Sequence, residues 1–412
     1  MKNVLLTLFC GLALQAFPQK YVGGDISLLP TMETAGAQYK THDGQPIADP
    51  LAFFAQEGMN AMRVRLFVDP SAYTGSDKDA NACQDLTYVL PLAQRIKRAG
   101  HKLLLDIHYS DTWADPGKQW TPAAWQTLSD AQLEQQVYDY TAQVLRRLQE
   151  AGAAPDFVQT GNEISFGMLW GRVGTGENRC YIDSPDANWT RFLNLLKRAT
   201  AACREVLPEA RIVLHSERTA GGAANVLRDW LQRLQSHAID YDIIGMSYYP
   251  AYHGAMSNLR AAIGVAEDFE KDIWIVETGY ALKWATSGTS FDYTGTYPYT
   301  DEGQRRFTAD LIAMLNQHDR VKGLFWWWME YNAFGTRLSG WYNAPLFDSQ
   351  TGRATSALGE LKHFHDNEAN AILLPLQATS DQSWYCLNGQ RVSRPASAGV
   401  YIRDGKKVSV IK

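Results

Sequence analysis

The stretch Phe157-Val158-Gln159-Thr160-Gly161-Asn162-Glu163 joins a short strand-like run to an acidic residue. A second stretch of the same design, Ile273-Trp274-Ile275-Val276-Glu277, follows far downstream. Short runs rich in β-branched and aromatic residues are typical of buried strands. A lone Glu at a strand end is usually a solvated carboxylate, so the meaning of this pair depends on how the rest of the chain is organised.

Strand-like and helix-like segments alternate along most of the chain. Strands are expected over residues 22–28, 61–68, 102–108, 157–161, 211–215, 243–247, 273–276 and 323–328. Helices are expected over residues 50–56, 86–99, 130–149, 189–206, 223–235, 258–269, 302–318 and 356–364. The strand segments are almost continuously apolar, which indicates a parallel sheet covered by helices. The sequence therefore predicts an α/β fold, a closed (β/α)8 TIM barrel with enlarged loops.

An open, doubly wound sheet is the alternative architecture. Such folds usually carry a glycine-rich phosphate loop between the first strand and the first helix. Here Gly23-Gly24 lie inside the first strand segment and do not lead into a helix. The closed barrel is therefore the favoured prediction.

Polar residues gather where the predicted strands end. In a (β/α)8 barrel the functional groups project from the carboxyl ends of the strands, so these side chains are expected to share one mouth. They are Asp25, Arg63, Arg65, the segment 108–115, Asn162, Glu163, His215, Tyr248, Tyr249, Glu277 and the run Trp326-Trp327-Trp328. Two carboxylates delivered from opposite strands of a barrel are the minimum equipment for cleaving a glycosidic bond.

Composition bounds the class of partner. The 412 residues are 45% hydrophobic and carry a formal net charge of -5, so the chain buries a large core and offers no basic footprint for nucleic acid. Its 13 Trp and 20 Tyr supply flat apolar faces with a polar edge, which suit sugar rings as well as core packing. A neutral partner fits better than a polyanion.

The two ends differ in character from the middle. Residues 1–19 combine Lys2, an apolar run and the small residue Ala16, which predicts a signal peptide and an exported protein, periplasmic, surface-held or extracellular. Residues 20–368 form the predicted barrel domain. Beyond it, residues 369–412 contain short strand-like runs separated by Asn388-Gly389 and Asp404-Gly405, which favour hairpin turns and predict a small β module or tail.

The cysteines follow no metal-ligand spacing. In an exported protein Cys83 and Cys180 are either paired or free, and the sequence leaves both states open. Cys203 lies on the apolar face of a predicted helix, so it is expected to be a packed thiol. We expect no catalytic metal and no cofactor.

Several motifs together resemble those of the arabinogalactan endo-β-1,4-galactanases, glycoside hydrolase family 53. The resemblance spans about residues 21–364, and its most specific part is the block from Asp106-Ile107-His108-Tyr109 to Gln119. The other matching motifs are Gly24-Asp25-Ile26-Ser27, Gly58-Met59-Asn60, Arg63-Val64-Arg65, Gly161-Asn162-Glu163, Gly245-Met246-Ser247-Tyr248-Tyr249-Pro250 and Val276-Glu277-Thr278.

The resemblance implies a retaining hydrolase in which Glu163 is the acid/base and Glu277 the nucleophile. Arg63 matches the strand-two arginine of related barrels, and a neighbouring cation would favour ionised Glu277. Tyr248, from strand six, is expected to orient the same carboxylate. Asn162, beside the acid, is expected to bind the sugar 2-hydroxyl.

The same likeness implies a wall around the reacting sugar. Trp327 aligns best with the tryptophan beneath that sugar, although a shift of one position would exchange it with a neighbour. The loop 280–300 contains one acid, Asp292, too few ligands for the calcium site of some bacterial relatives. His215 is retained, whereas Glu217 has no assigned role. The remaining expected sugar-binding residues are Asp25, His108, Tyr109, Asp111, Trp113 and Asp115.

The expected substrate is β-1,4-galactan or its oligosaccharides, cleaved internally by a monomer, with association at the outer cell surface left open. Recognition of the axial O4 of galactose would set specificity, because sites that bind a substrate hydroxyl discriminate strongly. Two alternatives remain: a related barrel endo-glycanase acting on mannan or glucan, and a non-catalytic surface glycan-binding barrel.

Overall fold

The computed structural model describes residues 19–289 and 291–365, and the strands Trp384–Cys386, Arg391–Val392, Gly399–Arg403 and Lys406–Val410. The chain divides into two compact units, residues 1–365 and 366–412. The predicted signal peptide lies almost entirely outside the described residues. No helix in the described part of the chain is both long and apolar enough to cross a membrane.

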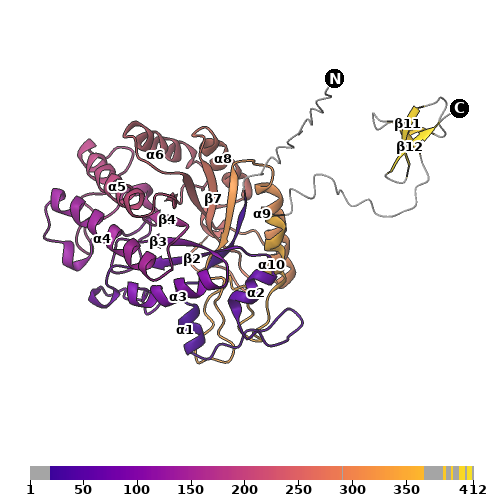
Figure 1. Ribbon diagram of the computed structural model, residues 1–412, viewed down its shortest axis with the longest axis horizontal. Coiled ribbons are helices and arrows are strands. Elements are labelled where there is room, and N and C mark those ends of the chain that lie inside the picture. The colour runs from indigo at the N-terminus through magenta and orange to yellow at the C-terminus, as the bar shows by residue number, and fades with distance from the viewer. Residues whose placement is uncertain are drawn as a thin grey trace, which may run out of the picture. The chain divides into compact units, whose positions relative to one another are not determined.

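The first unit is built on a closed parallel barrel in which every strand pairs with the next and β8 pairs with β1 (Figure 1). This order confirms the predicted (β/α)8 fold. The strands are β1 Tyr21–Asp25, β2 Ala61–Leu66, β3 Lys102–Ile107, β4 Phe157–Thr160, β5 Arg211–Ser216, β6 Ile243–Tyr248, β7 Asp272–Thr278 and β8 Val321–Trp326.

Helices surround the barrel, close to the predicted ranges. The longer ones are α3 Leu86–Arg98, α4 Asp130–Glu150, α5 Asp186–Val206, α6 Ala224–Ser236, α8 Met256–Glu267 and α9 Asp301–Leu315. The shorter ones are α1 Leu29–Thr34, α2 Pro50–Gln56, α7 Pro250–His253, α10 Ser356–Glu360, η1 Pro70–Ala72, η2 Ala123–Trp125, η3 Ile164–Phe166 and η4 Leu361–Phe364. Helix α4 begins with a capping box in which Ser129 and Gln132 satisfy each other's backbone amides.

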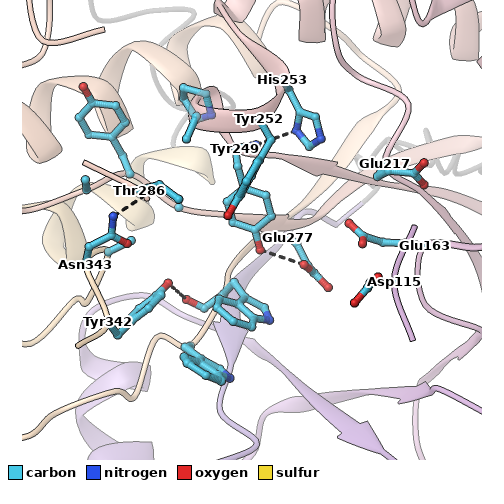
Figure 2. Close-up of a pocket in the computed structure, with 18 of the residues that line it drawn as sticks. Asp115, Glu163, Glu217, Tyr249, Tyr252, His253, Glu277, Thr286, Tyr342 and Asn343 are labelled. Atoms are coloured by element: carbon cyan, nitrogen blue, oxygen red, sulfur yellow. Dashed lines mark hydrogen bonds between the residues drawn. The ribbon is translucent and has the colours of Figure 1, made fainter. Parts of the chain in front are cut away.

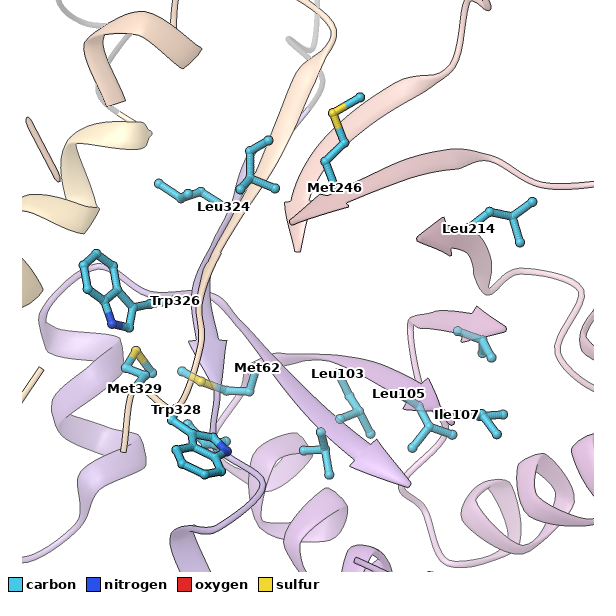
Figure 3. Packing of buried hydrophobic residues seen from close by; sticks show 14 of the residues in the cluster. Met62, Leu103, Leu105, Ile107, Leu214, Met246, Leu324, Trp326, Trp328 and Met329 are labelled. Atoms are coloured by element: carbon cyan, nitrogen blue, oxygen red, sulfur yellow. The ribbon is translucent and has the colours of Figure 1, made fainter. Parts of the chain in front are cut away.

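The layer between sheet and helices forms the main hydrophobic core. Alternate residues of each strand face this layer, as Leu103, Leu105 and Ile107 of β3 do, and Figure 3 shows part of the cluster. Their neighbour Leu104 belongs instead to a second cluster. The nearly continuous apolar character of the strands therefore reflects burial on both faces.

The second cluster fills the amino-terminal half of the barrel interior. Trp274 contacts Phe157 and Phe325, with ring centroids 4.5 and 5.5 Å apart. A Cβ added to Gly323 would lie 2.4 Å from the Trp274 ring, so glycine is required where the indole approaches β8. The cluster consists of Ala61, Leu104, Phe157, Val213, Ile243, Trp274, Val276 and Phe325, with Tyr21 packed against it.

The C-terminal unit contains an antiparallel sheet in the order β10-β9-β11-β12. Its strands are β9 Trp384–Cys386, β10 Arg391–Val392, β11 Gly399–Arg403 and β12 Lys406–Val410. The two predicted turn dipeptides, at 388–389 and 404–405, lie outside the described residues.

Among the described residues, Cys83, Cys180 and Cys203 are free thiols. Of the two states that the sequence left open for Cys83 and Cys180, the structure has the unpaired one. The Cys180 Sγ atom is 3.4 Å from the Asn188 carbonyl in α5, and the Cys83 Sγ atom is 3.4 Å from the side-chain amide of Gln84. Cys203 is buried in α5, as expected for a packed thiol.

Candidate active site

A cleft of about 680 Å³ opens at the carboxyl ends of the strands (Figure 2). Five carboxylates line it, together with the rings of Trp327 and Trp328. These two rings stack face to face with centroids 4.1 Å apart, so the buried Trp328 ring backs the Trp327 ring. The five carboxylates are Asp79, Asp115, Glu163, Glu217 and Glu277.

Glu277 reaches the cleft because of a bulge in β7. Ser247 of β6 pairs with Glu277 although its neighbour Met246 pairs with Ile275, so Val276 is an extra residue. Without the bulge, alternation from Trp274 would turn Glu277 towards the helices. Each of its oxygens has a fixed partner: Arg63 Nη2 lies 2.9 Å from Oε1, and the Tyr249 hydroxyl donates to Oε2 at 2.8 Å.

Glu163 follows β4 in a left-handed conformation, with φ 47°, just after Gly161 at φ 104°. Its backbone N–H donates to His215 Nδ1 at 3.2 Å, and the Ser247 hydroxyl donates to its Oε1 at 2.6 Å. Burial and the charge of Arg63 hold the pKa of His215 well below its usual range, so the imidazole is neutral. His215 Nε2–H then donates to the Ser247 oxygen at 2.8 Å and fixes the direction of that hydroxyl.

The two glutamates differ in electrostatic environment. Burial, followed by the charges of Glu277 and Glu217, raises the pKa of Glu163 well above its usual value. Burial also raises the pKa of Glu277, but the Arg63 cation and the Tyr249 hydroxyl act in the opposite direction. Within the described residues no cation pairs with Glu163. A proton shared by the two carboxylates therefore resides on Glu163.

Arg63 organises the polar half of the barrel interior. It is fully buried and donates to Asp25 Oδ2 at 3.2 Å, Asp106 Oδ2 at 2.7 Å and Asn162 Oδ1 at 2.9 Å, besides its contact with Glu277. Although burial opposes ionisation, Arg63 and His108 lower the pKa of Asp106 to about 2. Asp25 is fully buried beneath this network, so it supports the site without lining the cleft.

The loop after β3 forms one wall of the cleft. His108 accepts from the Ala114 amide through Nδ1, and its Nε2 lies 3.0 Å from Asp106. Trp113 donates from its indole N–H to Asp79 at 2.9 Å. The Asp115 carboxylate accepts from the Gly117 amide at 2.7 Å. His108, Trp113 and Asp115 thus lie where the sequence predicted them, beside Asn162.

Besides Asp25, Arg63 and His215, which are fully buried, three predicted site residues do not line the cleft. The Tyr109 hydroxyl bonds to Thr141 Oγ1 of α4 at 2.7 Å, because a positive φ of 52° turns this side chain away from the mouth. Asp111 accepts from the amides of Asp69 and Ala123, so it holds two loops together. Neither residue lines the cleft.

Tyr248 is the third correction. Ser247 faces the barrel interior, so strand alternation turns Tyr248 outwards, where its hydroxyl donates to the Gly254 carbonyl at 2.9 Å. The next residue, Tyr249, faces inwards and contacts Glu277. Alternation along β6 does place every second residue in the barrel interior, but the prediction chose Tyr248, whereas the inward-facing residues are Ser247 and Tyr249.

Other cleft residues were missed. Tyr252 and Trp341 line the cleft while 62% and 50% exposed, which leaves their rings available to a ligand. Ser247, which is fully buried and contacts Glu163, was quoted only as part of a motif. The signal of Tyr252 and Trp341 in the sequence is weak, because single exposed aromatics outside the barrel strands follow no periodicity. In the described residues no group of three or more potential ligands is placed to hold a metal ion.

Comparison with known proteins agrees with this geometry. The sequence profile of "Glycosyl hydrolase family 53" matches residues 21–361. The chain belongs to this family.

Relatives of this family align over most of the chain. It is 35% identical to an uncharacterized protein of Niallia circulans over 84% of this chain and 94% of the relative. It is 32% identical to the arabinogalactan endo-beta-1,4-galactanase of Cellvibrio japonicus over 85% of this chain and 92% of that protein. Among solved structures, the Ignisphaera aggregans GH53 catalytic domain aligns with a TM-score of 0.69 and 31% identity, over 88% of this chain and 100% of that domain.

Proposed function

We propose that this family 53 protein hydrolyses internal β-1,4-galactosidic bonds of galactan with retention of anomeric configuration. The observation that carries the proposal is the unequal pair of buried carboxylates in one cleft. Glu277 is held by Arg63 and Tyr249, whereas Glu163 has a neutral hydroxyl donor. The galactanase name of the aligned Cellvibrio japonicus protein supports the choice of sugar.

In the first step Glu163 donates its proton to the glycosidic oxygen while Glu277 attacks the anomeric carbon. The bond to the leaving sugar breaks and a bond from the sugar to a Glu277 oxygen forms. Arg63 and Tyr249 keep the attacking carboxylate ionised and oriented before this step. The fixed Ser247 hydroxyl holds the Glu163 carboxyl against the leaving group.

In the second step Glu163, now ionised, takes a proton from a water molecule that attacks the same carbon. The glycosyl bond to Glu277 breaks and the product keeps its configuration, because the carbon has been inverted twice. A carboxyl of raised pKa suits both tasks, since it is protonated at the start and regains its proton readily.

Asn162 and the wall residues position the sugar. One Asn162 N–H donates to the Ala114 carbonyl at 2.8 Å, and the other is free to bind a sugar hydroxyl. The Trp327 ring, backed by the stacked Trp328 ring, offers an apolar face for the pyranose ring. We assign recognition of the axial O4 hydroxyl of galactose to the wall that contains His108, Trp113 and Asp115.

The test is a product profile on linear β-1,4-galactan, with β-1,4-mannan and cellulose as alternative substrates. We expect galacto-oligosaccharides from galactan alone, with the β-anomer appearing first by proton NMR. Release from mannan or cellulose and none from galactan would favour the related glycanase. Binding of galactan without release of any product would favour the non-catalytic barrel.

The variant Glu163→Ala tests whether Glu163 is the general acid. Its kcat/KM on galactan should fall by roughly 10²- to 10⁴-fold, the contribution typical of a general acid. On a dinitrophenyl galactobioside the loss should be much smaller, because that leaving group departs without protonation. Equal losses on both substrates would contradict the acid role.

A further inference from the structure

Glu217 is a buried carboxylate to which the proposed mechanism gives no task. It follows β5, is only 7% exposed, and lines the same cleft as Glu163. In Figure 2 Glu217, Glu163 and Asp115 lie on one side of the cleft, with Glu277 facing them. A carboxylate is costly to bury without function or compensation.

Its partners belong to the turn that carries Glu163. The Glu217 carboxylate contacts the Ser165 hydroxyl at 2.5 and 2.8 Å and the Arg218 Nε atom at 2.9 Å. Ser165 lies in η3, which begins directly after Glu163. Glu217 is therefore tied to the short segment that sets the left-handed backbone of Glu163.

Arg218 closes the same arrangement. Its Nε atom also donates to the Ser165 oxygen at 3.1 Å, and its guanidinium lies 3.7 Å from the centre of the Phe166 ring. Phe166 is the last residue of η3. The loop after β5 thus holds η3 through two neighbouring side chains: Glu217 by hydrogen bonds, and Arg218 by a hydrogen bond and a cation–π contact.

Glu217 has a cationic partner, whereas Glu163 has none among the described residues. Burial raises the pKa of Glu217, and the Arg218 cation and Ser165 hydroxyl counter that effect by favouring its ionised form. The ionisable groups that face Glu163 from the surrounding elements are Glu277, Glu217, Asp115, Tyr249, Tyr252 and His215. None of them is a cation: the imidazole is neutral, and tyrosine ionises only to an anion. Burial raises the pKa of both tyrosines, so their hydroxyls stay neutral.

We propose that Glu217 is a positioning residue that keeps Glu163 protonated and correctly aimed: its charge opposes ionisation of Glu163, and its bonds to Ser165 and Arg218 hold the η3 turn. The inference rests on the proposed function, because it assigns the proton on Glu163 to catalysis. It makes the loop after β5 a determinant of the alkaline limit of activity.

The decisive variant is Glu217→Gln, which keeps the shape and removes the charge. Without that charge Glu163 ionises more easily, so the alkaline limb of kcat/KM on galactan should move to lower pH by about half a unit or more. The unpaired Arg218 would act in the same direction. At pH values on the alkaline limb, kcat/KM of the variant should therefore be at least about threefold lower than that of the wild type. The loss should be smaller at acidic pH.

Two matched variants separate charge from packing. Glu217→Asp keeps the charge and should restore most of the wild-type alkaline limb. Ser165→Ala removes the hydroxyl but leaves Glu217 and Arg218, so it should lower kcat several-fold without moving the limb. An alkaline limb that moves equally in all three variants would show a general effect of loosening η3 and would overturn the electrostatic role.

A titration independent of turnover completes the test. In the full-length protein labelled with ¹³C at the Glu side-chain carboxyls, the signal absent from Glu163→Gln identifies Glu163. Its titration midpoint should lie lower in Glu217→Gln than in the wild type, even if galactan proves not to be the substrate. An unmoved midpoint in the folded variant would overturn the inference and leave the proposed hydrolysis untouched.

Discussion

The two halves of the barrel interior use the same strands for opposite purposes. In the amino-terminal half Phe157, Trp274 and Phe325 pack ring against ring. In the carboxyl-terminal half, a few residues further along, Arg63 contacts Glu277 and two further acids, Asp25 and Asp106. Burial of apolar side chains in the first half stabilises the fold, whereas burial of charged groups in the second half has a desolvation cost.

The difference teaches that stability and chemistry can be separated by position along one strand. On β2, Ala61 belongs to the apolar cluster and Arg63 to the ionic network, although both face inwards. Changes in one half should therefore leave the property of the other half largely intact. Three substitutions test this division.

Glu277→Ala should have the largest effect. Removing the nucleophile should lower kcat on galactan by roughly 10⁴-fold or more. The fold should survive, because Arg63 keeps Asp25 and Asp106 as partners. Turnover and thermal unfolding measured on the same preparation check both statements. A loss below tenfold would mean that another residue attacks the sugar.

Phe157→Ala should lower stability while leaving turnover almost unchanged. Phe157 is buried against Tyr21 and Trp274, so its truncation should lower the free energy of unfolding by about 3–5 kcal/mol. The kcat per folded molecule should stay within about twofold of the wild type, since the ionic network is unchanged. Denaturant titration together with active-site-normalised turnover provides the measurement. Lost activity at unchanged stability would refute the division.

Tyr249→Phe should have the smallest effect, and Tyr248→Phe is its neighbouring control. Loss of the Tyr249 hydroxyl removes a donor to the ionised Glu277, so kcat/KM should fall about 10- to 100-fold. The pKa of Glu277 should rise, which moves the acidic limb to higher pH. Tyr248→Phe should change neither quantity appreciably, since its hydroxyl bonds to a loop carbonyl. The opposite ranking would restore the prediction made from sequence.

Much of the fold was predictable because regular strands and helices carry their burial in local periodicity. The predicted segment 61–68 contains β2 Ala61–Leu66, and the segment 130–149 corresponds to α4 Asp130–Glu150. The order of strands followed from their alternation with helices, since parallel neighbours need a crossover. The placement of Glu163 and Glu277 at strand ends followed from the same pattern.

The side chains around them were harder to predict, because regularity ends where the strands end. Positive φ angles at Tyr109 and Trp328 redirect those side chains, and no local pattern announces them. Tyr109 therefore leaves the mouth, whereas Trp328 lines it beside Trp327. Trp327, the tryptophan expected beneath the sugar, stacks on Trp328. Periodicity alone could not show that both side chains lie at the cleft.

The sequence by itself determined the barrel, the two glutamates and the family likeness, because these depend on residue type, spacing and strand order. The tertiary structure decided that the β7 bulge turns Glu277 inwards and that Tyr249 holds it in place of Tyr248. It also decided that Glu217 joins the turn of Glu163. The physical reason is that bulges, left-handed residues and buried charges are stable only when contacts distant in sequence compensate their cost.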